Sequence, residues 1–188
     1  MRWVQRRAWP SETFLMSGAA KYSVLEHLRD GRSIEVRALH PSDKDGMLAA
    51  IGRTSSQSIQ RRFFGPKKGL SDQEIAFFLN IDFERHVALV AQIDEDGRAA
   101  IVGGGRYIMV APDQAEIAFV VVDAYQSQGI GTILMRNLTI LARKAGVKEL
   151  VAEVLPENTA MLKVFGKFGF RPGSKRTFQV VHLALPLA

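Results

Sequence analysis

The sequence contains no cysteine. This absence excludes disulfide bonds, thiolate nucleophiles and thiolate metal ligands, so any chemistry must come from oxygen and nitrogen groups. Histidine is scarce as well: there are 4 histidines, widely separated, and no two lie one helical turn apart as metal-binding pairs often do. We therefore predict that the protein has no metal site.

Long apolar runs are also missing. No stretch approaches the roughly 20 consecutive apolar residues that span a bilayer, so no membrane-spanning segment is expected. The first twenty residues include Arg2, Arg6 and Arg7 but no apolar core of signal-peptide length. We expect residues 1–20 to be a flexible N-terminal extension, residues 21–188 to form a single domain, and the protein to be cytoplasmic.

The bulk composition is that of a folded protein. Of the 188 residues, 47% are hydrophobic and 23% are charged, which suffices for one domain with a core. The formal net charge of +6 suits an anionic ligand, an acidic partner or nucleic acid without distinguishing them. Basic residues flank an aromatic pair in RRFFGPKK (residues 61–68), but a solvated helix end or a rim facing an acidic protein fits this pattern better than nucleic acid. Arg106 fits either a salt bridge or a contact with cofactor or substrate.

Periodicity predicts an α+β, or mixed α/β, domain built on one central sheet. Helical spacing and capping residues predict helices that begin at Pro41 and extend over 56–64, 72–80, 131–145 and 158–168. Apolar runs bounded by turn residues predict strands over 33–39, 88–93, 100–110, 116–122, 149–155 and 177–185. The breaks at 94–97 and 111–113 are short enough for antiparallel hairpins.

One strand-to-helix connection has the pattern of an anion site. An apolar strand at Val120–Val122 continues into a turn containing Gly129 and Gly131 and then into a helix. The first N–H groups of a helix lack internal partners, and its dipole places about half a positive charge there, which matches a pyrophosphate. The two glycines allow a phosphate to approach the backbone.

Other interpretations of this connection are a tight turn without a ligand and two better-known phosphate motifs. A Rossmann fingerprint does not fit because Leu134 occupies the position of the third glycine. A P-loop does not fit because no Gly-Lys-Ser/Thr follows. A different phosphate-bearing cofactor is therefore favoured.

Two motifs resemble those of the GNAT superfamily of N-acetyltransferases. Gln126-x-x-Gly129-x-Gly131 is similar to the Gln/Arg-x-x-Gly-x-Gly/Ala signature of that family, and Asn158–Phe170 resembles its later helix, which runs from Asn to a terminal Gly-Phe. The front half, including RRFFGPKKGLS and the strand that begins at Glu116, looks like the catalytic domain of bacterial Pat-type protein lysine acetyltransferases. The resemblance implies a GNAT fold: a mostly antiparallel sheet, flanked by helices, whose parallel strands splay at an acyl-CoA site.

The resemblance also implies that acetyl-CoA, the acyl donor, lies between the strand of residues 119–121 and that of 149–155. It assigns cofactor binding to Phe119, Val120, Val121, Ser127, Gln128, Gly129, Ile130, Gly131, Thr132, Asn158 and Phe165. Two of these residues also have structural interpretations. Asn158 is a good helix N-cap, and Phe165 has the position of a core residue.

By position, Glu116 matches the glutamate that acts as general base in Pat-like enzymes, with Glu153 as the reserve candidate. The implied reaction is direct transfer of acetyl, in a ternary complex, to a protein lysine such as one on an acyl-CoA synthetase. Many GNAT enzymes have a tyrosine acid where this sequence has Phe165, and a phenyl ring cannot donate a proton. A small-molecule amine acetyltransferase and a non-catalytic acyl-CoA sensor therefore remain alternatives, and the protein is expected to be a monomer or homodimer.

Overall fold

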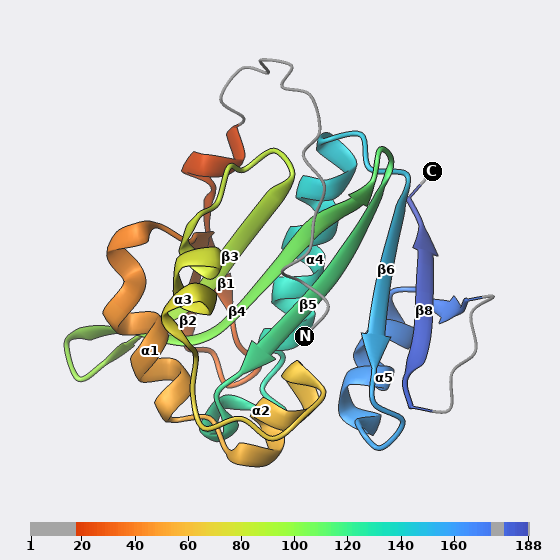
Figure 1. The fold of residues 1–188 in the computed structure, drawn as a ribbon. Helices are drawn as coiled ribbons and strands as arrows, with labels where there is room; N and C mark the ends of the chain where they lie inside the picture. The colour runs from red at the N-terminus through yellow and green to blue at the C-terminus, as the bar shows by residue number, and fades with distance from the viewer. Residues whose placement is uncertain (1–17, 174–178, 188) are drawn as a thin grey trace.

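The structure, a computed structural model, describes residues 18–173 and 179–187 (Figure 1). An 8-stranded sheet has the order β1-β2-β3-β4-β5-β6-β8-β7. All neighbouring strands are antiparallel except β5 and β6. The strands are β1 (Ser23–His27), β2 (Ser33–Ala38), β3 (His86–Glu95), β4 (Arg98–Ala111), β5 (Gln114–Val121), β6 (Glu149–Val154), β7 (Arg171–Pro172) and β8 (Val181–Pro186).

Helices cover both faces of the sheet (Figure 1). They are α1 (Lys44–Gly52), α2 (Ser56–Phe63), α3 (Asp72–Leu79), α4 (Ile130–Lys144) and α5 (Thr159–Lys167), with short 3-10 turns η1 (Gly18–Lys21), η2 (Pro41–Asp43) and η3 (Asp123–Tyr125). Side chains of α1 and α3 share one core cluster with the front of the sheet, and side chains of α4 and α5 share another with its back. The predicted α+β fold with a mostly antiparallel central sheet is confirmed.

The predicted elements agree with the observed ones to within a few residues, with two strands missed. The predicted helix over 131–145 is α4, which ends before Gly146 at a φ of 78°. The missed strands are β1 and β7. The last predicted strand begins in the structure at Val181, and its first predicted residues, 177 and 178, lie outside the described residues. So does most of the predicted extension over 1–20, although residues 18–21 form η1.

The one parallel pair of strands is short. β5 pairs with β6 only at residues 114–116, opposite residues 149–151. Beyond Glu116, β5 continues to Val121 and keeps its antiparallel pairing with β4, but it has no further register with β6. The two strands therefore separate, as Figure 1 shows below the labels of β5 and β6.

Helix α4 packs closely on the back of β4 because that strand contains three consecutive glycines. A Cβ atom at Gly105 would lie 2.8 Å from Leu138 Cδ1, closer than real Cβ contacts allow, and 3.0 Å from Phe119 Cβ, which is a tight contact. Leu134 and Leu138 of α4 have no exposed surface as a result of this packing. A side chain at Gly105 would force the end of the Leu138 side chain and the neighbouring Phe119 to shift.

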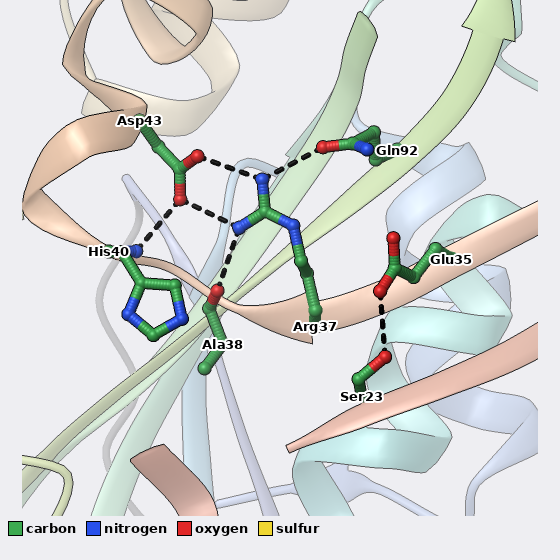
Figure 2. A network of polar contacts seen from close by, with 7 residues as sticks. All are labelled: Ser23, Glu35, Arg37, Ala38, His40, Asp43 and Gln92. Atoms are coloured by element: carbon green, nitrogen blue, oxygen red, sulfur yellow. Dashed lines mark hydrogen bonds and ion pairs between the residues drawn. The ribbon is translucent and has the colours of Figure 1, made fainter. Parts of the chain in front are cut away.

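A part-buried ion pair fixes the start of helix α1 to strand β2 (Figure 2). Arg37 donates Nη1 to Asp43 Oδ2 at 2.7 Å and Nη2 to Asp43 Oδ1 at 2.8 Å, and Nη2 also reaches Gln92 Oε1 at 2.8 Å. Burial disfavours the charged form of Asp43, but the hydrogen bonds from Arg37 and from the His40 N–H outweigh it and hold the Asp43 pKa below its ordinary value.

Within residues 18–173 and 179–187, no helix is both long and apolar enough to cross a membrane.

His86, at the start of β3, makes folding sensitive to acid. Its side chain is 6% exposed, and its Nε2 lies 2.9 Å from Arg106 Nη1. Burial and the positive charge of Arg106 lower the pKa of His86 to about 4. The folded state thus binds a proton less readily than the unfolded chain, where histidine titrates near 6.5. The stabilisation is complete above about pH 6.5 and is lost as the pH falls towards 4.

We predict that the free energy of unfolding of the wild type falls by about 3 kcal/mol more than that of His86→Asn between pH 7 and pH 4. Urea unfolding at a series of pH values measures this difference. His27→Gln, which replaces an exposed strand histidine, should keep the wild-type slope. Parallel pH profiles for the wild type and His86→Asn would contradict the prediction.

Candidate functional site

A cleft of about 450 Å³ opens where β5 and β6 separate. One wall is β5 from Glu116 to Val121, the opposite wall includes Glu153 and Val154 of β6, and helix α5 closes the side. The loop between β5 and α4 forms the end of the cleft. The site is therefore a direct product of the short parallel pairing.

The loop from β5 to α4 presents helix N–H groups to the cleft. Ser127 and Gly129 adopt positive φ angles of 63° and 100°, and α4 begins at the next residue, Ile130. No side chain caps this helix, and its first helical bond runs from the Ile133 N–H to the Gly129 carbonyl. The N–H groups of residues 130–132 therefore have no helical partner, and these residues line the cleft. Together with the helix dipole they form a site for an anion such as a pyrophosphate.

Asp123 joins this loop to helix α2. Its carboxylate accepts hydrogen bonds from the Ser55 N–H at 2.7 Å, Ser55 Oγ at 2.7 Å and Ser58 Oγ at 2.9 Å. Gln126 adds a second tie, since its Nε2 donates to Ser58 Oγ and to the Val121 carbonyl, both at 3.1 Å. Burial disfavours the Asp123 carboxylate, but these serine donors outweigh it and lower its pKa.

The structure brings together all but one of the residues predicted to form the site. Those that line the cleft are Glu116, Phe119, Val120, Val121, Ser127, Gly129, Ile130, Gly131, Thr132, Asn158 and Phe165. Gln128 is not among them. Its Oε1 accepts from Arg32 Nη2 at 2.6 Å, and its Nε2 donates to the Ala124 carbonyl at 3.0 Å.

Asn158 and Phe165 both have the structural roles that the sequence suggested. Asn158 Oδ1 accepts from the Met161 N–H at 3.3 Å, so it caps α5. Phe165 is 2% exposed, and its ring packs edge-on against Phe170 with centroids 4.7 Å apart. Its phenyl ring therefore belongs to the core while also forming part of the cleft wall.

Glu116 is the last residue of β5 that pairs with β6, opposite Val151, and it lies opposite Ile108 of β4 on its other side. It is partly buried and lines the cleft. Its negative charge acts on the Arg62 guanidinium, where burial lowers the arginine pKa and Glu116 partly restores it. Glu153 is on the opposite wall, with its Oε1 3.4 Å from His182 Nδ1.

Sequence patterns missed several basic residues of the cleft: Arg29, Arg61, Arg62, Lys163 and Lys167. The first lies in the turn between β1 and β2, and the others lie on α2 and α5. Arg61 Nε is buried without a hydrogen-bond partner. The sequence signal for them was the basic cluster after residue 60, which fitted a solvated helix end or a rim facing an acidic protein. Within the described part of the chain, no group of three or more acidic or histidine side chains lies close enough together to hold a metal ion.

Comparison with known proteins agrees with this geometry. Residues 56–170 match the Acetyltransferase (GNAT) family. An acetyltransferase of Pseudomonas aeruginosa is 32% identical over 147 residues, which cover 78% of this chain and 79% of that protein. Acetyltransferase Pat of Mycolicibacterium smegmatis is 29% identical over 144 residues, and the match covers 76% of this chain but 42% of Pat.

Solved structures give the same result. The GNAT domain of S. lividans PAT superposes with a TM-score of 0.80 at 31% identity, covering 87% of this chain and 96% of that domain. yncA from Salmonella typhimurium, solved with its cofactor acetyl-CoA, superposes with a TM-score of 0.64 at 18% identity over 82% of this chain and 94% of that one, a likeness of fold alone. The family match and the relatives together establish that the chain belongs to the GNAT family of acetyltransferases and is an N-acetyltransferase.

Proposed function

We propose that the protein transfers the acetyl group of acetyl-CoA to a protein lysine, with Glu116 as general base. The observation that carries this proposal is the position of Glu116 on the cleft wall, where β5 and β6 separate. This carboxylate lies on β5, the strand that also carries the proposed thioester site beside Val120. The GNAT family uses acetyl-CoA as its donor, and the cleft suits that molecule at both ends.

The donor would lie along β5 with its pyrophosphate on the loop before α4. The N–H groups of residues 130–132 and the helix dipole match the pyrophosphate. The cleft edge of β5 beyond Glu116 is available to pair with the pantetheine amides as an added strand would. Arg29 and Arg61 add positive charge to the same cleft, in keeping with a ligand that carries several phosphates.

The proposed step is a direct attack within a ternary complex. The lysine nitrogen attacks the thioester carbonyl carbon, a C–N bond forms, the C–S bond breaks, and CoA leaves as the thiolate. The proton of the attacking amine passes to the Glu116 carboxylate through water in the cleft, because Glu116 lies four residues before Val120 on β5, or about 13 Å along the strand. This base is required because lysine, with a reference pKa near 10.4, is overwhelmingly protonated at neutral pH. A main-chain N–H near Val120 or Val121 would polarise the carbonyl oxygen.

Many family members have a tyrosine that protonates the departing CoA thiolate, and this chain has Phe165 at that position. Phe165 cannot act as the acid. Its ring is fixed in the core between Phe119 and Phe170, with centroids 5.5 Å and 4.7 Å away. A thiolate whose reference pKa is near 8.5 is a tolerable leaving group, so water suffices as the proton source. The same observation favours, as a second candidate, an acyl-CoA sensor that binds CoA without turnover.

A protein acceptor is supported by the Pat relatives and by the charge around the site. The net charge is +6, and α2 and α5 contribute Arg61, Lys163 and Lys167 to the cleft. A basic rim favours an acidic protein surface around the target lysine. A lysine of an acyl-CoA synthetase is the acceptor that we propose to test first, in the cytoplasm.

We predict that Glu116→Gln lowers kcat/KM for a synthetase-derived lysine peptide by about 10²- to 10⁴-fold, because the general base is lost. Binding of acetyl-CoA should stay within a few-fold of the wild type. Thiol release measures turnover, and calorimetry measures binding. The matched control is Glu157→Gln, an exposed residue of the loop before α5.

Three outcomes separate the candidates. If Glu116→Gln acetylates the peptide as fast as the wild type does, Glu116 is not the base and Glu153 becomes the candidate. Tight CoA binding without turnover of any amine would favour the sensor, and turnover of small amines alone would remove the protein acceptor. Mass spectrometry of a lysate incubated with labelled acetyl-CoA identifies the acceptor directly.

A second prediction concerns the tie between the donor loop and α2. Asp123→Asn should lower the free energy of unfolding by about 1–3 kcal/mol, because an amide cannot accept all the bonds that the carboxylate receives from Ser55 and Ser58. It should also weaken acetyl-CoA binding, since the loop loses its anchor. Urea unfolding and calorimetry test both effects, and Asp113→Asn, in an exposed turn, serves as the charge-matched control. Equal stability of the two variants would show that the tie contributes nothing.

A further inference from the structure

A second, smaller cavity lies under α1, α2 and α3 on the front face of the sheet. Its volume is about 80 Å³, several times the roughly 10–15 Å³ that one water-sized group requires. It shares Arg62, Ala118 and Val120 with the donor cleft, so the two hollows meet on β5. Most of its wall is apolar: Leu39, Met47, Ala50, Ile51, Ile59, Phe63, Phe78 and Ile101.

Two arginines, Arg62 and Arg106, line this apolar cavity. None of the described residues that line it is acidic. Arg106 forms no ion pair with any residue of 18–173 or 179–187. Its Nη1 lies 2.9 Å from His86 Nε2 and 3.4 Å from the Phe78 carbonyl, and its Cζ lies 4.2 Å from the Phe78 ring centroid.

The charge of Arg106 is therefore poorly compensated. Burial and the like charge of Arg62 lower the pKa of Arg106 to about 9. His86, whose pKa is lowered to about 4, is neutral at pH 7 and supplies no negative charge. The negative charge of Glu116 acts on Arg62, and burial still lowers the Arg62 pKa. A partly desolvated guanidinium without a carboxylate partner is costly, and an anion in the cavity would remove that cost.

Position along the sheet indicates which anion fits. Gly104 lies opposite Val120, and Arg106 lies opposite Ala118, two residues or about 7 Å further along β4. Because Gly104 has no side chain, the floor of the cavity beside Val120 stays open. An acyl chain that starts at a thioester beside Val120 would pass over Gly104 and reach the guanidinium of Arg106 within a few carbon atoms.

We propose that this cavity binds the terminal carboxylate of a short dicarboxylic acyl chain, such as malonyl or succinyl, carried on CoA. The inference rests on the proposed binding of acyl-CoA in the cleft. The transfer is otherwise the same: the amine nitrogen bonds to the acyl carbon, the C–S bond breaks, CoA leaves as the thiolate, and Glu116 takes the amine proton. The product is an amide that retains a free carboxylate, which reverses the charge of the modified lysine.

The test compares succinyl-CoA with butyryl-CoA, which has the same chain length without the carboxylate. With a lysine peptide that has no carboxyl groups, the wild type should show a kcat/KM at least about tenfold higher for succinyl-CoA, as a charge-assisted hydrogen bond allows. Arg106→Met should reduce this ratio at least about tenfold, and Arg106→Lys should recover part of it. Arg143→Met, an exposed change of equal charge on α4, should keep the wild-type ratio.

Other outcomes overturn the proposal. The proposal is wrong if the wild type uses succinyl-CoA and butyryl-CoA equally well. It is also wrong if the preference for succinyl-CoA is unchanged in both Arg106→Met and Arg62→Met. Urea unfolding must first show that these variants fold. If acetyl-CoA turnover is instead faster with free lysine than with lysine amide and Arg106→Met removes that difference, the cavity binds the carboxylate of the acceptor.

A separate arm distinguishes failure of this proposal from failure of the proposed function. Calorimetry with succinyl-CoA and butyryl-CoA measures the carboxylate preference even if no amine is acylated. Absence of acetyl-CoA turnover together with an Arg106-dependent preference for succinyl-CoA would contradict the proposed function alone. Turnover of acetyl-CoA without that preference would contradict the cavity assignment alone.

Discussion

The parallel ladder between β5 and β6 ends at residues 116 and 151, and the site exists because of this early end. A backbone edge inside a protein needs hydrogen-bond partners. Where β6 turns away, β5 offers an edge that a ligand with amide groups can complete, and the space left behind is the cleft. Had the ladder continued to Val121, a closed sheet would have left no room for a donor.

Charge on the front face follows from the same geometry. Alternate residues of β5 point to opposite faces, so Glu116, Ala118 and Val120 face α2, while Ile117 and Phe119 enter the core against α4. Arg62 descends from α2 onto this row and lies near Glu116 at one end of the second cavity. The proposed base and the proposed carboxylate site are therefore linked through a single guanidinium.

Sequence reasoning succeeded where local chemistry decides the outcome. Gly129 and Gly146 mark the ends of α4 because both adopt positive φ, and Asn158 marks the start of α5 because its side chain caps the helix. The motif residues around Gly129 lie together at the end of the cleft, since a strand followed at once by a helix leaves few alternative paths. Gln128 was predicted to bind the cofactor because it lies within the same motif. Its side chain instead forms a hydrogen bond with Arg32, ninety-six residues away in the sequence.

The failures share a cause, which is packing between distant segments. β1 has an alternating but mostly exposed pattern, so only its pairing with β2 defines it as a strand. Arg62 has the sequence context of a solvated helix end or of a rim facing an acidic protein, and it is partly buried because α2 packs on β5. For Arg106 the sequence left open a salt bridge and a contact with cofactor or substrate, and it could not show that the guanidinium lies beside His86 and the Phe78 ring.

The tie through Asp123 has a consequence for the order of events in catalysis. One carboxylate anchors both the loop proposed to hold the donor phosphates and the helix that borders the acceptor side. An acceptor that steadied α2 would steady the donor loop as well, and thermodynamic reciprocity requires each ligand to change the other's affinity by the same factor. Cooperation between the two substrates would then need no lid or domain movement, only a shared anchor.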